Sequence, residues 1–246
     1  MAAPVAIRDV ATHVEHDGFA ILAETIGPTE ISTILSAVQR IGETLMQAPR
    51  GGARALFEHV PEIRTLALDG LVREAAAAVV GPDCFPVRAL FFDKTPAANW
   101  KVAWHQDLTI AVRARRDVAG YGPWSSKAGI PHVQPPISVL ERMVALRVHL
   151  DDCGPDNGPL RVLPGSHRAG LLRASEIDAW RQRVAELSCI VLRGGLLVMR
   201  PLLLHASSPA KSPAHRRVIH VEYAATDLSG GLEWFEQREL RSSISS

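Results

Sequence analysis

Apolar and polar residues follow one pattern before about residue 84 and another pattern after it. In the first part, apolar positions recur every three to four residues, as on one face of a helix, over 4–18, 27–47 and 61–81. Gly18 and Gly81 stand where two of these helices would end, and Pro28 stands near the start of the third. With the strand-like run 19–24, residues 1–83 are predicted to be mostly helical around one strand.

The second part consists of short runs rich in β-branched and aromatic residues, separated by Gly, Pro, Asn and Asp. These runs are 84–94, 100–112, 143–150, 158–163, 188–192, 195–200 and 216–225. One helical pattern, 174–187, interrupts them. Many short strands joined by turn residues are typical of an antiparallel sandwich or jelly roll. The predicted fold class is therefore mainly β with flanking helices, the N-terminal helices packing on one sheet.

Neither an internal repeat nor a low-complexity linker divides the chain, so we expect a single domain over 1–246. Within it, 84–225 would form the β core and 226–246 a C-terminal tail. The segment 113–138 is polar and rich in Gly and Pro, and long loops in compact domains are usually functional or mobile. We interpret it as a lid-like insertion over an active site.

Composition narrows the function classes. Hydrophobic residues make up 47% and charged residues 22% of the 246 residues, which is ordinary for a globular protein with a core. A net charge of +1 gives no overall attraction to nucleic acid or an anionic membrane. The three cysteines are an odd number at wide spacing, which favours reduced thiols. No apolar run could span a bilayer, and the N-terminus lacks a signal-peptide core. We expect a cytoplasmic protein with a small-molecule substrate, of unknown oligomeric state.

Two His-x-Asp pairs are candidates for metal binding. In "VAWHQDLT", residues 102–109, strand alternation places His105 and Asp107 on one face and turns Gln106 away. The rival pair is His149 and Asp151 in "VHLDD". Asp151 leads into a run of turn formers, where Asp commonly bonds its own backbone. The first pair is therefore the simpler choice of metal ligands, although spacing alone does not exclude the second pair.

A third ligand is available in "LLLHASS", where His205 follows a β run. Two imidazoles and one carboxylate form the facial triad of non-haem Fe(II) oxygenases, which leaves positions on the metal open. The same three groups also bind Zn²⁺, so a zinc-dependent enzyme is an alternative.

Three stretches in this order resemble the phytanoyl-CoA dioxygenase family: "WHQD", "HLDDCGPDNGPLRVLPGSHR" and "LLLHASSPAKSPAHRRVIHVEYA". The resemblance runs from Phe19 to Tyr223 and implies an Fe(II)- and 2-oxoglutarate-dependent oxygenase on a double-stranded β-helix. It implies that His105, Asp107 and His205 bind Fe(II), with O2 as second cosubstrate and ascorbate stimulating turnover.

The resemblance also implies that Arg216, eleven residues after His205, binds the far carboxylate of 2-oxoglutarate, with Ser207 and Lys94 assisting. Alternation along 216–225 independently favours Arg216 over Arg217. Arg217 shares the apolar face that should pack against helices, whereas Arg216 shares the polar face that suits the barrel interior. A planar guanidinium binds a carboxylate through two parallel hydrogen bonds.

The activity that the resemblance implies is hydroxylation of an unactivated C–H bond, with release of succinate and CO2. Because related halogenases replace the carboxylate ligand by a small residue, Asp107 predicts hydroxylation and not halogenation. A coenzyme A thioester is not predicted. Candidate substrate-binding residues are Arg147 and His149 on one strand face, and Trp124 and Gln134, beside Tyr121 and His132, in the insertion. A non-catalytic β-barrel that only binds a ligand is the remaining alternative, which the full set of metal and arginine residues disfavours.

Overall fold

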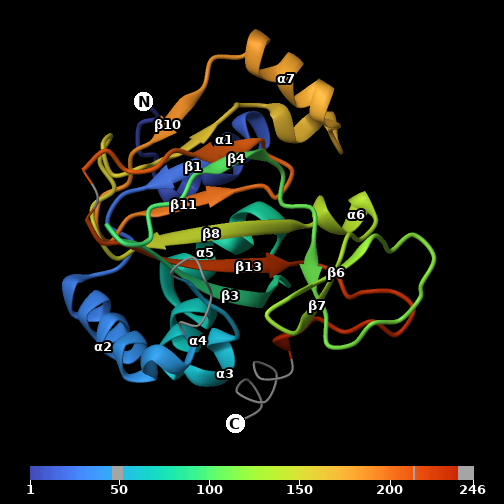
Figure 1. The fold of residues 1–246 in the computed structure, drawn as a ribbon, viewed down its shortest axis with the longest axis horizontal. Helices are drawn as coiled ribbons and strands as arrows, with labels where there is room; N and C mark the ends of the chain where they lie inside the picture. The colour runs from blue at the N-terminus through green and yellow to red at the C-terminus, as the bar shows by residue number, and fades with distance from the viewer. Residues whose placement is uncertain (46–51, 213, 238–246) are drawn as a thin grey trace.

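The structure is a computed structural model that describes residues 1–45, 52–212 and 214–237. Its centre is a six-stranded antiparallel sheet in the order β1-β11-β8-β13-β3-β2 (Figure 1). These strands are β1 (Phe19–Leu22), β11 (Leu196–Met199), β8 (Met143–His149), β13 (Arg216–Ala224), β3 (Phe85–Lys94) and β2 (Gly52–Ala53). β13 pairs with β3 over 216–224 and with β8 over 218–224, so it lies near the centre of the sheet.

A second antiparallel sheet, β10-β9-β12-β4, faces the first. Its strands are β10 (Leu187–Cys189), β9 (Leu160–Val162), β12 (His205–Ser207) and β4 (Val102–His105). Apolar side chains from both sheets, among them Ile21, Leu197 and Val162, pack together in one buried cluster. The two facing sheets confirm the predicted jelly-roll class with flanking helices.

The N-terminal helices cover the outer face of the large sheet (Figure 1). They are η1 (Ile7–Asp9), α1 (Val10–Asp17), α2 (Pro28–Leu45), α3 (Leu56–His59), α4 (Pro61–Leu68) and α5 (Gly70–Val80). Ile219, Val221 and Tyr223 of β13 are buried against them, and the Tyr223 hydroxyl donates to the Ala67 carbonyl at 2.8 Å. Alternation predicted this apolar face of β13, and the structure confirms it.

The single helix predicted over 61–81 was wrong. The helix breaks between α4 and α5, where Asp69 is extended (φ −128°, ψ 169°) and Gly70 has φ +64°. Apolar spacing continues on both sides of the break, so periodicity could not reveal it. The Asp-Gly dipeptide, a common turn former, was the available signal.

The run 100–112 is likewise two strands in different sheets, not one. After β4 the chain leaves the strand, and the backbone N–H of Asp107 donates to the Pro201 carbonyl at 2.9 Å. β5 (Ile110–Ala111) then joins a separate sheet. Asp107 therefore lies in the irregular segment just beyond the strand that carries His105.

The segment 113–138 contains a hairpin where a loop was expected. β6 (Trp124–Lys127) and β7 (Ile130–Val133) pair with each other, and β7 pairs with β5. Ala128 and Gly129 both have positive φ, 52° and 78°, which matches the twist that two-residue hairpin turns require. The sequence "WSSK" is too polar to read as a strand. α6 (Ile137–Leu140), η2 (Ser166–Ala169) and α7 (Ala174–Arg183) complete the described elements.

Part of the expected C-terminal tail packs into the fold, while 238–246 lie outside the described residues. Trp234 is buried, and the Glu236 carboxylate accepts hydrogen bonds from the backbone N–H groups of Phe57 and Ala89, both at 2.8 Å. Within the described chain, every helix is too short or too polar to cross a bilayer.

Candidate metal and cosubstrate site

A cavity of about 230 Å³ opens between the two sheets. Strands β3, β4, β8, β9, β12 and β13 contribute side chains to it, together with the hairpin and the segment after β2. The lining residues are Arg54, Arg88, Leu90, Phe92, Trp100, Val102, His105, Asp107, Lys127, Arg147, Leu160, His205, Ser207, Arg216 and His220.

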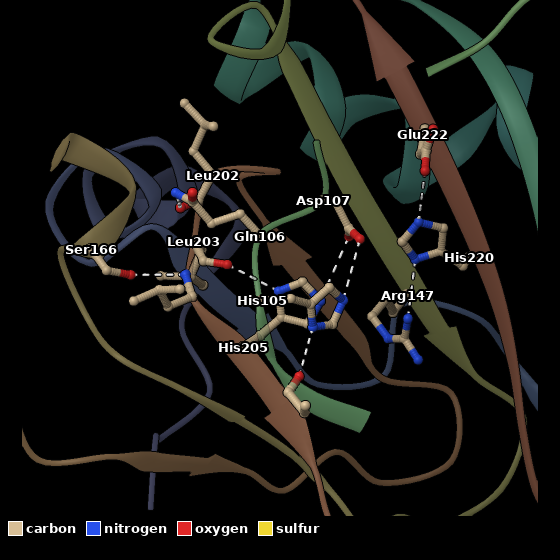
Figure 2. Close-up of polar contacts among 12 residues, drawn as sticks. His105, Gln106, Asp107, Arg147, Ser166, Leu202, Leu203, His205, His220 and Glu222 are labelled. Carbon is tan, nitrogen blue, oxygen red and sulfur yellow. Dashed lines mark hydrogen bonds and ion pairs between the residues drawn. The ribbon is translucent and has the colours of Figure 1, made fainter. Parts of the chain in front are cut away.

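Strand pairing brings the three candidate metal ligands together. His205 on β12 is the register partner of His105 on β4, and Asp107 follows two residues later. Figure 2 shows the Asp107 carboxylate facing both imidazoles: Oδ1 is 3.6 Å from Nε2 of His105, and Oδ2 is 3.6 Å from Nε2 of His205. One potential ligand atom from each of the three residues lies within 4.8 Å of the others. Atoms that share an ion at about 2.0–2.2 Å lie about 3–4 Å apart, so this spacing fits a metal ion.

Both histidines are held in the tautomer that a metal ion requires. Nδ1 of His105 donates to the Ala103 carbonyl at 2.8 Å, and Nδ1 of His205 donates to the Leu203 carbonyl at 2.9 Å. These hydrogen bonds place the proton on Nδ1, which leaves the Nε2 lone pair of each ring directed at Asp107. Such outer hydrogen bonds fix ring orientation and raise the basicity of a histidine ligand.

The protonation states of these three side chains also favour metal binding. Burial lowers the pKa of His205 to about 4, so this imidazole is neutral at pH 7. Burial opposes the ionisation of Asp107, but the electrostatic interaction with His205 and the hydrogen bond with His105 outweigh it and lower the pKa of the carboxyl group. Burial would lower the pKa of His105, yet the Asp107 carboxylate raises it. An ionised carboxylate beside two imidazoles that can bind through Nε2 is a donor set that suits a divalent transition metal.

Gln106, between the two ligands, points away from them as alternation predicted. Its amide donates to the carbonyls of Gly170 and Leu202 at 2.8 and 2.7 Å, and accepts from the Leu172 N–H at 2.9 Å. This side chain therefore connects the segment that carries Asp107 to the loops before α7 and β12.

Arg216 and Arg217 point to opposite sides of β13. Arg217 bonds Asp151 through Nε at 2.8 Å and through Nη2 at 2.6 Å, outside the cavity. Asp151 lies in a bend after β8, but the expected bond to its own backbone was wrong, because its carboxylate bonds the backbone and guanidinium of Arg217. Arg216 lines the cavity, donates to the Gly158 carbonyl, and keeps a buried Nε without a partner among the described residues.

Lys94 and Ser207 lie beside Arg216. Lys94 is the register partner of Arg216, and its Nζ donates to Ser207 Oγ at 3.2 Å and to the Ser208 carbonyl at 2.9 Å. Lys94 is fully buried, and burial together with the Arg216 charge lowers its pKa to about 8. The end of the cavity around Arg216 therefore concentrates two buried cations and a hydroxyl.

A chain of polar contacts that the sequence did not reveal links Arg147 to the far end of the cavity. Arg147 lies 3.2 Å from Nδ1 of His220, whose Nε2 lies 3.3 Å from the Glu222 carboxylate (Figure 2). Glu222 also pairs with Arg88, which contacts Nε2 of His132 at 3.0 Å. The polar face of β13 was the signal for His220 and Glu222; their partners required the tertiary structure.

The other candidate substrate residues are not brought to the cavity. His149 is buried, and its Nδ1 has no partner among the described residues, but its side chain is not part of the cavity lining. Trp124 packs against the cluster around Tyr121, with Arg115 above its ring at 5.5 Å. Gln134 joins its neighbours through backbone bonds to Gly122 and Pro123. Of the segment 113–138, Lys127 is the residue that lines the cavity.

Comparison with known proteins agrees with this geometry. The family model described as phytanoyl-CoA dioxygenase (PhyH) matches residues 14–218. The chain belongs to the phytanoyl-CoA dioxygenase family. The match spans all three candidate metal ligands and Arg216, and it confirms the resemblance found in the sequence.

Curated relatives of this family member include the ectoine dioxygenase of Sphingopyxis alaskensis, which is 23% identical over 186 residues. That alignment takes in 71% of this chain and 54% of the relative, so the chain spans about half the length of the curated relatives it matches.

Solved structures share the fold. The crystal structure of EctD from S. alaskensis with 2-oxoglutarate and 5-hydroxyectoine has a TM-score of 0.69 at 19% identity, over 91% of this chain and 77% of that chain. HygX from Streptomyces hygroscopicus, with nickel and 2-oxoglutarate bound, has a TM-score of 0.65 at 18% identity, over 91% and 88%.

Proposed function

We propose that this protein is an Fe(II)- and 2-oxoglutarate-dependent dioxygenase that hydroxylates a C–H bond of a small molecule. The observation that carries the proposal is the presence, in one cavity, of the His105, Asp107 and His205 ligand atoms and of the Arg216 guanidinium. A zinc hydrolase or a simple binding protein has no use for the buried arginine and lysine beside such a triad.

The side chains divide into two roles. His105, Asp107 and His205 would hold the metal from one side, which leaves its other side open toward the cavity. Bound there, Fe(II) would bring 2-oxoglutarate and O2 together for the oxidative decarboxylation that releases succinate and CO2. Arg216 would take the far carboxylate of 2-oxoglutarate, with Lys94 adding charge and Ser207 a hydroxyl at the same end.

Turnover of 2-oxoglutarate tests this proposal. With Fe(II), ascorbate and O2, wild type should release succinate slowly even without a substrate, and Asp107→Ala should lose most of that turnover. Arg216→Gln should raise the KM for 2-oxoglutarate about 10- to 100-fold, the usual effect of removing a charged hydrogen-bond partner.

Arg217→Gln is the matched control for this experiment, because Arg217 is the adjacent residue but lies outside the cavity, where it bonds Asp151. Its KM for 2-oxoglutarate should stay within about twofold of wild type. Equal effects of the two substitutions, or unchanged turnover in Asp107→Ala, would refute the assignment.

A further inference from the structure

The cavity holds more positive charge than the metal and cosubstrate account for. Five basic side chains line it, Arg54, Arg88, Lys127, Arg147 and Arg216, against one lining carboxylate, Asp107. Glu222, buried behind the lining, pairs with Arg88. Fe(II) and the 2-oxoglutarate dianion carry equal and opposite charges, so binding both leaves the excess unchanged. The lining cations therefore outnumber the carboxylates near them, and this excess suits a cavity that binds an anionic molecule.

The cations at the Arg88 end of the cavity are separated by most of the length of β13 from Arg216, which would bind 2-oxoglutarate. Arg216 pairs with Lys94 at one end of the strand, and Glu222 pairs with Arg88 at the other. Six residues of strand separate them, or about 20 Å at about 3.4 Å per residue. His220 lies between these ends, and it lines the cavity together with His105, Asp107 and His205. A cosubstrate that reaches from the metal to Arg216 therefore leaves the opposite end free.

Two cations at that opposite end lack an acidic partner. Among the described residues, Arg54 forms neither a hydrogen bond nor an ion pair through its side chain, although it lies close enough to the Arg88 and Glu222 charges to be affected by them. Lys127 donates from Nζ to Thr109 Oγ1 at 2.9 Å and pairs with none of the described carboxylates. Lys127 is exposed on the hairpin, and partial desolvation of its amino group together with the charges of Arg88 and Arg54 lowers its pKa, so these cations repel one another.

The two residues reach the cavity from different segments. Gly52 and Ala53 of β2 pair with Phe92 and Phe91 of β3, so Arg54 follows directly at the sheet edge beside Leu90. Lys127 is the last residue of β6, next to the hairpin turn. Arg88, by contrast, already donates a hydrogen bond to the Glu222 carboxylate and contacts Nε2 of His132.

We propose that Arg54 and Lys127 bind an oxyanion, a carboxylate or a phosphate, of the substrate at the end of the cavity opposite Arg216. The substrate class is therefore a small anionic molecule, and this inference rests on the proposed function for treating the cavity as an active site. The Arg54 guanidinium would donate two parallel hydrogen bonds to oxygens of the anion, and Lys127 would add a positive charge from the hairpin. Anchoring the anion there fixes the rest of the molecule toward His105, Asp107 and His205.

Binding of matched small anions to the anaerobic Fe(II)- and 2-oxoglutarate-saturated protein tests the inference. Calorimetry would use propionate and methyl phosphate as probes and propionamide as the neutral match. Wild type should bind at least one anion and not the amide. Arg54→Gln and Lys127→Gln should each weaken that binding about tenfold or more, which corresponds to loss of one charged hydrogen bond.

Arg115→Gln is the control for a change in net charge, because Arg115 is exposed and pairs with Asp117 at 3.6 Å. It should leave anion binding unchanged. The visible charge-transfer absorbance of the Fe(II)–2-oxoglutarate complex, recorded on the same samples, should be equal in all these variants. Preference for methyl phosphate or for propionate would identify which oxyanion the substrate carries.

Other outcomes separate the inference from the proposed function. Equal anion binding in wild type and both cavity variants, or binding of neither anion by wild type, would overturn the inference alone. Loss of 2-oxoglutarate absorbance in Arg54→Gln would also overturn it, by assigning that cation to the cosubstrate. The absorbance could be absent from wild type and all variants while anion binding still depends on Arg54 and Lys127. That result would support the anion site and contradict the proposed function.

Discussion

At the scale of single residues, two adjacent arginines have separate tasks because a strand alternates its faces. The Arg216 side chain lines the cavity, whereas the Arg217 side chain lies on the opposite side of β13. There the Asp151 carboxylate accepts hydrogen bonds from the guanidinium and the backbone N–H of Arg217. Burial raises the pKa of the Asp151 carboxyl, but the hydrogen bonds and charge of Arg217 outweigh this and lower it. The pair is part-buried, so it should contribute measurably to stability.

Asp151→Asn should therefore destabilise the fold by about 2 kcal/mol at pH 7, since it removes charged hydrogen bonds. A depressed carboxyl pKa gives stability that is present above the unfolded value of about 3.9 and is lost as pH falls through the lower folded value. The difference between variant and wild type should accordingly shrink below about pH 4. Urea unfolding at several pH values measures it.

Asp156→Asn is the control, because the pair of Asp156 with Lys211 is exposed and spans 3.4 Å. Its effect should be about 0.5 kcal/mol or less. A cost at Asp151 that equals the cost at Asp156, or that does not change with pH, would count against the role given to the Arg217 pair.

At the scale of elements, the sequence predicted the strands and helix faces well and their interruptions poorly. Alternation along 216–224 identified which side of β13 meets the helices, because a period of two directly separates the two faces. The break at Asp69 was missed because it does not disturb the hydrophobic period, and the hairpin in 113–138 was missed because its first strand is too polar to show one. Local backbone conformation decides both features.

The break between α4 and α5 leads to a prediction about Gly70. Gly70 has φ +64°, and a Cβ added there would meet nothing within 4 Å, so Gly70→Ala should be strained by conformation alone. The cost should be about 1 kcal/mol in free energy of unfolding. Gly27 is equally open but is not in the left-handed region. Gly27→Ala should thus be neutral or slightly stabilising, and equal costs at both positions would contradict this account of the break.

At the scale of the whole molecule, the candidate site joins segments that are far apart in the sequence. Motif spacing and resemblance pointed to His105, Asp107, His205 and Arg216, which the fold brings into one cavity. Arg54 and Lys127 carry no motif, and only the pairing of β2 with β3 and the hairpin bring them near each other. Spacing left His149 open as a ligand, whereas the structure places its side chain outside the cavity lining.

The measurement that tests the central claim most directly is an anaerobic titration with Fe(II) and then 2-oxoglutarate, followed by visible metal-to-ligand charge-transfer absorbance. Wild type would be compared with His105→Ala and His149→Ala, the two histidines of the rival His-x-Asp pairs. We predict an absorbance band in wild type and in His149→Ala that disappears in His105→Ala. A band that survives in His105→Ala and is lost in His149→Ala, or no band in wild type, would contradict the metal centre described above.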